Sequence, residues 1–220
     1  MARQPLAADP TSEIFLLVLG DLLRWFPEYQ TNPSIAWRVQ EALTAATFSE
    51  WARFTKPGLQ DIFCSASRSS RKAGARNAQY AKVGLPPVGR KPSFIVVQYE
   101  VFGAPRFQPG GEFSPPQSFY GHLKHIISVT FPEGYEDLRL CGGTTLAFAF
   151  FNRCILTQKD PRLDRLNIHF YSDEDTNLQI TDISCVRGLV GRIRDESNSW
   201  AIIDRCGRFS REAYLTHEAS

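Results

Sequence analysis

Residues 178–206 read LQITDISCVRGLVGRIRDESNSWAIIDRC, and this stretch decides the fold. Branched or apolar residues alternate with Arg and Gly from Val186 to Arg194, and an apolar run resumes from Trp200 to Asp204. Between the two runs, Asp195 to Ser199 is charged and turn-forming. Two apolar runs that flank a short polar turn are typical of a β-hairpin.

Further segments upstream are also rich in branched and aromatic residues and are separated by Gly, Pro or acidic turns. Thr144 to Leu156 is a continuous apolar run that suits a buried strand or a short helix, and we prefer the strand. Because no helix-length segments alternate with the strands, an antiparallel barrel or sandwich is favoured over a parallel sheet. The six predicted strands are Phe94 to Phe102, His122 to Phe131, Thr144 to Ile155, Leu166 to Tyr171, Ile180 to Arg194 and Trp200 to Asp204.

The stretch from Thr11 to about Ala66 has helical spacing, since apolar residues recur three and four positions apart. Three helices fit: Ser12 caps the first, Asn32 before Pro33 opens the second, and Ser49 caps the third. We expect the aromatic side chains of this stretch to pack in the core. They are Trp25, Phe26, Trp37, Phe48, Trp51 and Phe54.

Charge is distributed unevenly along this chain of 220 residues, although its formal net charge is only +2. No Asp or Glu occurs between Ile62 and Tyr99, where Ser, Arg, Lys, Ala, Gly and Pro predominate. The sequence predicts an α+β protein with a helical subdomain over residues 1–66, a basic linker over 67–92 and a barrel-like β domain over 93–215. The basic residues of the acid-free stretch are Arg68, Arg71, Lys72, Arg76, Lys82, Arg90 and Lys91.

The cysteines and the short apolar run near the start favour an intracellular protein. The five cysteines show no CxxC or Cys/His spacing, so buried reduced thiols are expected rather than a disulfide framework or a zinc site. The run Ile14 to Leu19 has only six residues and is followed by Asp21. It is expected to be neither a signal peptide nor a membrane span.

Three segments carry a resemblance to a known group: YGHLKHIISV (Tyr120 to Val129), ITDISCVRGLVGRI (Ile180 to Ile193) and WAIIDRCGRFSREAY (Trp200 to Tyr214). Together they resemble uncharacterised proteins of mushroom-forming fungi, many of them linked to transposable elements. The likeness extends from Ser93 to Tyr214. The β-rich part of that group looks somewhat like a bromo-adjacent-homology (BAH) module, a bent β-barrel that docks on partners in chromatin proteins. The resemblance implies no enzymatic activity and favours the nucleus over the cytoplasm.

Histidines supply one candidate site. His122 and His125, with His169 and Asp173, contain the ligand types of a metal or acid/base cluster. On a strand, however, side chains three apart point to opposite faces unless a bulge intervenes. We therefore expect a structural role and no metal.

A thiol and three carboxylates supply two other candidate sites. Cys141 before Gly142-Gly143 suits a nucleophile on a turn, with His122 or His125 as base. Asp182, Asp195 and Asp204 suggest a carboxylate site, although acids at turns and strand edges are the commoner interpretation. Neither GxGxxG after a strand nor GxxxxGK[ST] occurs, so no cofactor is expected.

The basic segment SRSSRKAGAR (Ser67 to Arg76) gives the better functional signal, because cations with small neighbours suit nonspecific contacts to DNA or RNA phosphates. A solvated linker is the competing interpretation. We interpret the chain as a non-enzymatic interaction module of mobile-element origin, with the β domain docking a protein partner. The nucleic-acid contacts are Arg68, Arg71, Lys72 and Arg76. Two alternatives stay open: a small hydrolase centred on Cys141 or the pair His122 and His169, and a structural oligomerising subunit.

Overall fold

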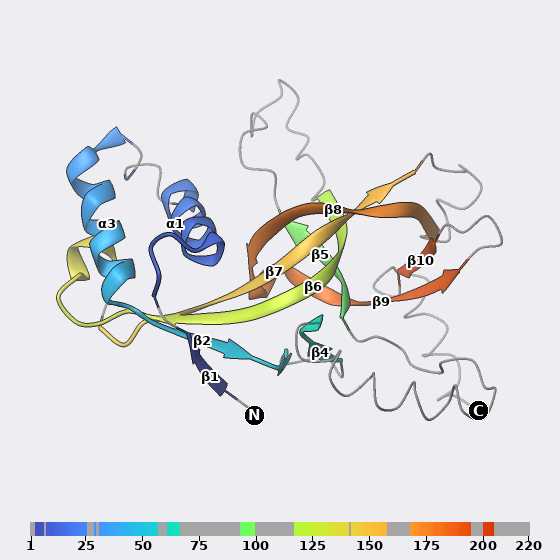
Figure 1. Cartoon of the computed structure of the whole chain (residues 1–220), viewed down its shortest axis with the longest axis horizontal. Coiled ribbons are helices and arrows are strands. Elements are labelled where there is room, and N and C mark those ends of the chain that lie inside the picture. Colours follow the sequence, from blue (N-terminus) through green and yellow to red (C-terminus); the bar gives the residue numbers. More distant parts are fainter. Residues whose placement is uncertain are drawn as a thin grey trace, which may run out of the picture.

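The computed structural model describes residues 3–6, 8–25, 29, 31–56, 61–66, 93–99, 117–140, 142–157, 168–194 and 200–204. Two α-helices and ten β-strands lie in these residues, arranged as Figure 1 shows. In chain order they are β1 (Arg3–Leu6), α1 (Glu13–Trp25), α3 (Pro33–Ala45), β2 (Thr47–Trp51), β3 (Arg53–Thr55), β4 (Ile62–Cys64), β5 (Phe94–Tyr99), β6 (Gln117–Thr130), β7 (Thr145–Leu156), β8 (Ile168–Asp182), β9 (Val186–Arg194) and β10 (Trp200–Asp204).

The first two predicted helices and their caps are confirmed. Ser12 Oγ accepts a hydrogen bond of 3.2 Å from the Phe15 amide at the start of α1. Asn32 caps α3 by accepting from the Ser34 amide at 3.1 Å, and Pro33 occupies the first turn. These contacts satisfy amides that have no partner within a helix. The caps therefore fix where each helix begins.

The predicted third helix is wrong, because Ser49 lies inside strand β2. This strand pairs with β1 on one side and with β6 on the other. Trp51 and Phe54 are three positions apart, which resembles helical spacing, but they lie in two short strands, β2 and β3, that Ala52 separates. Pairing with β6 outweighs the local pattern, as tertiary context commonly does for aromatic-rich segments. Trp37 is a second correction, because 64% of it is exposed on α3 instead of packing in the core.

Six strands close into an antiparallel barrel, which confirms the predicted fold class. The order around the barrel is β6-β5-β9-β10-β8-β7, and the pairing of β7 with β6 closes it. The decisive hairpin is confirmed, since Val186–Arg194 pairs with Trp200–Asp204 in antiparallel register. One predicted strand, Ile180 to Arg194, is divided in the structure by a 3-10 turn at Ile183–Cys185.

Among the described residues, the buried apolar side chains form three clusters on different sides of the sheet. The first lies between the helices and the strands β2, β6 and β7, and includes Phe15, Val39 and Phe148. The second lies outside the barrel under the β3–β4 hairpin, where Phe63 covers residues such as Ile95 and Phe151. The third takes residues from all six barrel strands and therefore fills the barrel interior. Its members are Phe94, Val96, Tyr120, Cys154, Tyr171, Val190 and Ile202.

A bulge in β6 determines which side chains face each cluster. The β6–β7 register shifts between Leu123 and His125. Leu123 and Ile126 are three apart, yet both belong to the cluster outside the barrel. The extra residue of a bulge reverses the alternation of faces, and this explains why they share a side. Beyond the bulge, β6 and β7 run past the barrel and carry the helices (Figure 1).

Residues 67–92 lie outside the described part of the chain, and with them the predicted linker. Its two flanks are both attached to the barrel. Before it, Phe63 of β4 is buried in the outer cluster, and after it β5 pairs with β6 and β9. The described residues on its two sides therefore contact the same β unit. The division of the chain into three parts stays a prediction.

Gly121 of β6 offers a test of the packing, because the Phe151 ring lies over it. A Cβ added there would be 2.3 Å from Phe151 Cδ2 and 3.0 Å from the Asn152 carbonyl oxygen. We expect Gly121→Ala to lower the free energy of unfolding by about 2 kcal/mol, as overpacking of a core commonly does. Urea denaturation measures the change. Gly20→Ala on α1 is the matched control, since nothing lies within 4 Å of the added Cβ. There the change should be neutral or stabilising, because Ala favours helix over Gly.

Candidate functional site

Side chains from four barrel strands stack into one column. His122 of β6 lies against the Phe94 ring of β5, with ring centroids 4.3 Å apart and planes inclined by 15°. The guanidinium carbon of Arg192, on β9, lies 3.4 Å from the Phe94 centroid and 4.3 Å from that of Trp200, on β10. The column therefore runs His122, Phe94, Arg192, Trp200 across the barrel interior. We call it the aromatic–arginine column.

Arg192 is the cation at the centre of this column. Its Nη1 donates a hydrogen bond of 2.5 Å to the Tyr171 hydroxyl. Among the described residues, no carboxylate lies within ion-pair distance of it. Two aromatic rings attract the cation, each by about 0.5–2 kcal/mol depending on how far water is excluded. Arg192 is thus held by rings and one hydroxyl rather than by an acid.

Glu174 of β8 is the acid beside the column, and two basic side chains already contact it. Its Oε2 accepts a hydrogen bond from Lys124 Nζ at 3.1 Å and lies 3.0 Å from His122 Nδ1. Burial alone would raise the pKa of Glu174, but hydrogen bonds and positive charge from His122 and Lys124 lower it to about 2. Glu174 is therefore ionised throughout the physiological range and forms a local ion network.

The buried thiol and phenol of the interior are poor nucleophiles. Burial, reinforced by the Glu174 charge, raises the pKa of Cys154 to about 12. Burial also raises the pKa of Tyr171 to about 12, although its hydrogen bond to Arg192 works in the opposite direction. Both groups stay protonated near neutral pH, and a thiol without thiolate is unreactive. Cys64 and Cys185 are half-buried free thiols, and Cys141 and Cys206 lie outside the described residues.

The histidines singled out from the sequence do not form one cluster. The bulge that would let His122 and His125 share a face is present, but each contacts a different acid. His122 contacts Glu174, and His125 Nδ1 lies 2.8 Å from Glu50 Oε1 on β2. His169 packs against the Tyr120 ring, with centroids 4.9 Å apart. The described residues contain no group of three or more His, Cys, Asp or Glu placed to hold a metal.

The acidic candidates are also dispersed. Asp182 caps the 3-10 turn before β9 by accepting from the Ser184 amide. Asp204 Oδ2 accepts a hydrogen bond from the Tyr120 hydroxyl at 3.0 Å. Asp173 accepts from the Glu174 amide at 2.8 Å. Asp195 falls outside the described residues, as do Arg68, Arg71, Lys72 and Arg76.

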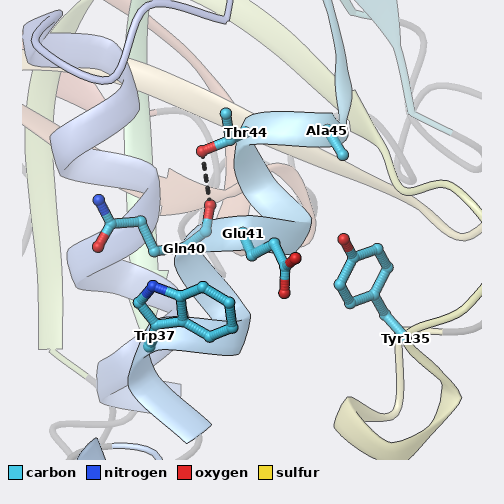
Figure 2. Close-up of a pocket in the computed structure, with 6 residues that line it drawn as sticks. All are labelled: Trp37, Gln40, Glu41, Thr44, Ala45 and Tyr135. Carbon is cyan, nitrogen blue, oxygen red and sulfur yellow. Dashed lines mark hydrogen bonds between the residues drawn. The ribbon is translucent and has the colours of Figure 1, made fainter. Parts of the chain in front are cut away.

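A shallow groove on α3 is a further surface feature, shown in Figure 2. Its volume is about 420 Å³, and it lies between the exposed Trp37 indole and the Tyr135 ring. Arg38 fixes the neighbouring loop through an ion pair of 2.9 Å with Asp137. The remaining lining residues are Gln40, Glu41, Thr44 and Ala45.

Sequence reasoning missed Arg192 and Trp200 as members of a site. A signal was present, since Val190, Arg192 and Arg194 alternate within a strand and so share a face. Arg192 is in the same alternation as the apolar Val190, and this indicates that a charged side chain lies beside the apolar core. What it contacts depends on strands that are distant in sequence.

Comparisons with protein families, with curated proteins and with solved structures give no match for this chain. Among the described helices, none is long and apolar enough to cross a membrane. The site is therefore interpreted from its own geometry.

Removal of the Glu174 carboxylate tests the ion network. The folded pKa of about 2 lies below the ordinary 4.5, so this carboxylate stabilises the fold above pH 4.5 and loses its effect as pH falls towards 2. We expect Glu174→Gln to cost about 1–2 kcal/mol at neutral pH, a value reduced for its partial exposure. Denaturant unfolding across pH should show the difference from wild type shrinking below pH 4.5. Glu41→Gln, at an exposed site on α3, is the control and should show no such trend. A difference that stayed constant down to pH 2 would contradict the network.

Proposed function

We propose that this chain is a non-enzymatic interaction module, derived from a mobile element and acting in the nucleus. It contacts DNA or RNA nonspecifically through Arg68, Arg71, Lys72 and Arg76, and a protein partner through its BAH-like β domain. The observation that carries the proposal is the charge asymmetry: seven cations and no acid occur between Ile62 and Tyr99. Such a segment suits phosphate contacts, which need no defined base sequence.

The fold supports this proposal by anchoring the basic stretch. On one side of it, Phe63 of β4 packs against the outside of the barrel, and on the other side Phe94 of β5 belongs to the barrel itself. A segment whose two ends are attached to one scaffold can extend only a limited distance from it. A nucleic acid bound there would be held close to the barrel surface.

The protein-partner half of the proposal rests on the resemblance and on exposed apolar side chains. The barrel interior is filled by its own core residues, which leaves the outer surface for docking. Ile155 of β7 and Ile193 of β9 are each more than half exposed, and Trp37 is exposed beside the α3 groove. Aromatic and aliphatic anchors of this kind are common at the centres of interfaces.

Binding across a salt series tests the nucleic-acid half. The purified protein is titrated into labelled duplex DNA and labelled single-stranded RNA, beside a variant with Arg68, Arg71, Lys72 and Arg76 changed to Ala. We expect affinity to fall with salt, and the variant to lose most of it. Each lost phosphate contact should reduce the logarithmic salt slope by about 0.7–0.9.

A matched pair of double variants separates position from net charge. Arg71→Ala with Lys72→Ala removes two charges from the basic stretch. Arg53→Ala with Arg187→Ala removes two from exposed sites on β3 and β9. Equal losses of affinity in the two would argue against a specific role for the stretch. If the wild-type protein binds no nucleic acid at low salt, the proposal is wrong.

Alanine substitution at Cys141, His122 and His169 tests the hydrolase alternative. We expect no hydrolysis of ester, thioester or phosphoester substrates that disappears with these substitutions, because His122 contacts Glu174 and His169 packs against the Tyr120 ring, so the two histidines do not share a site. An activity that is present in the wild type and absent in the variants would replace the binding proposal with an enzyme.

A further inference from the structure

The aromatic–arginine column has the chemistry of an anion site. Arg192 offers N–H donors in a planar fork, of which one nitrogen bonds the Tyr171 hydroxyl. Within the described part of the chain, none of its nitrogens is buried without a partner, so its remaining donors face solvent. A planar fork with free donors matches phosphate oxygens bidentately.

The column also places Arg192 rigidly. The Arg192 guanidinium carbon lies 3.4 Å from the Phe94 ring centroid and 4.3 Å from that of Trp200, and these rings come from β5 and β10, the two neighbours of β9. A side chain that is already ordered loses less rotamer freedom when it binds, and this favours affinity. The acids nearby are engaged elsewhere, since Glu174 contacts Lys124 and His122, and Asp204 accepts from Tyr120. No described acid therefore serves as counter-ion to Arg192, and a bound anion could take that place.

The position of the column points to nucleic acid as the source of that anion. Phe94 is the second described residue after the basic stretch, and Lys91 precedes it by three positions. Arg192 and Trp200 lie near the free end of the β9–β10 hairpin, which Figure 1 shows at the end of the barrel far from the helices. Trp200 is half-buried and supplies an aromatic group next to the cation. Proteins that bind single-stranded nucleic acid commonly combine cations with aromatic rings in this way.

We propose that Arg192, clamped between Phe94 and Trp200, binds a backbone phosphate of single-stranded nucleic acid at this end of the barrel. The inference rests on the proposed function and gives it a second contact point, separate from the basic stretch. The phosphate pairs with the outward edge of the guanidinium, and an adjacent base packs on the exposed part of Trp200.

The test compares Arg192→Gln with Arg187→Gln, which removes one exposed charge from the same strand. Binding of labelled oligothymidylate is followed by fluorescence anisotropy in a salt series. We expect Arg192→Gln to weaken binding about tenfold, as loss of a charge-assisted hydrogen bond does, and to reduce the salt slope by about 0.7. Arg187→Gln should change affinity by less than about twofold. Duplex DNA should be affected less than the single strand by Arg192→Gln.

A second measurement on the wild-type protein covers the case in which Arg192→Gln does not fold. The Nε–H resonance of Arg192 in a ¹⁵N spectrum is assigned by its absence in Arg192→Lys. It should shift when oligothymidylate is added, and an unchanged resonance under saturating strand would overturn the inference. Inorganic phosphate and polyglutamate are added as separate probes. A shift with polyglutamate as large as that with the strand would also overturn it, since the site would then accept any anion.

The outcomes distinguish this inference from the proposed function. If the basic-stretch variant loses binding while a folded Arg192→Gln binds as the wild type does, the proposed function stands and the inference is wrong. Equal weakening of single strand and duplex by Arg192→Gln also refutes the single-strand assignment. If the wild type binds neither nucleic acid, both are wrong.

Discussion

Strand β6 is the element on which the rest of the structure depends, because it pairs with three neighbours. Its first half pairs with β5, most of its length with β7, and its last residues with β2. The β6–β7 pairing closes the barrel, and the β2 pairing attaches the helical layer to the same sheet. Antiparallel pairing satisfies the backbone groups on both edges of the strand. Without β6, neither the barrel nor the contact with the helices would form.

The bulge in β6 allows one strand to serve two different cores. Before it, Tyr120 and His122 face the barrel interior. Beyond it, Ile127 and Val129 pack against the helices. A strand of regular alternation would direct one of these sets into the wrong environment. The bulge thus permits a barrel and a helix-covered sheet to share a single pair of long strands.

The interior of the barrel is less apolar than its core residues suggest. The ring of six strands is filled by large side chains, and polar residues within β6, β8 and β9 lie beside them. His122, Arg192 and Glu174 then need partners in a region of low dielectric. Aromatic faces and hydrogen bonds provide those partners, and Arg192 therefore needs no acid from the described residues. The column therefore contributes to the stability of the barrel.

Much of the fold follows from local sequence. The alternation in Val186–Arg194, the turn-forming residues after it and the caps at Ser12 and Asn32 act over a few positions, so they can be recognised without knowing the rest. The third helix could not be recognised as wrong, since Ser49 lies in a strand only because β1 and β6 flank it. Trp37 resembles a core residue in a helical pattern, and its exposure depends on which face of α3 the sheet covers.

For the candidate site too, some features follow from local sequence and others from tertiary contacts. The sequence by itself determined the basic, acid-free stretch and the hairpin, because composition and alternation are properties of neighbouring residues. Only the tertiary structure decided that His122 and Phe94 meet the hairpin residues Arg192 and Trp200, since β5 and β6 are far from the β9–β10 hairpin along the chain. Closure of the barrel sets those distances, and no local pattern encodes which strands become neighbours.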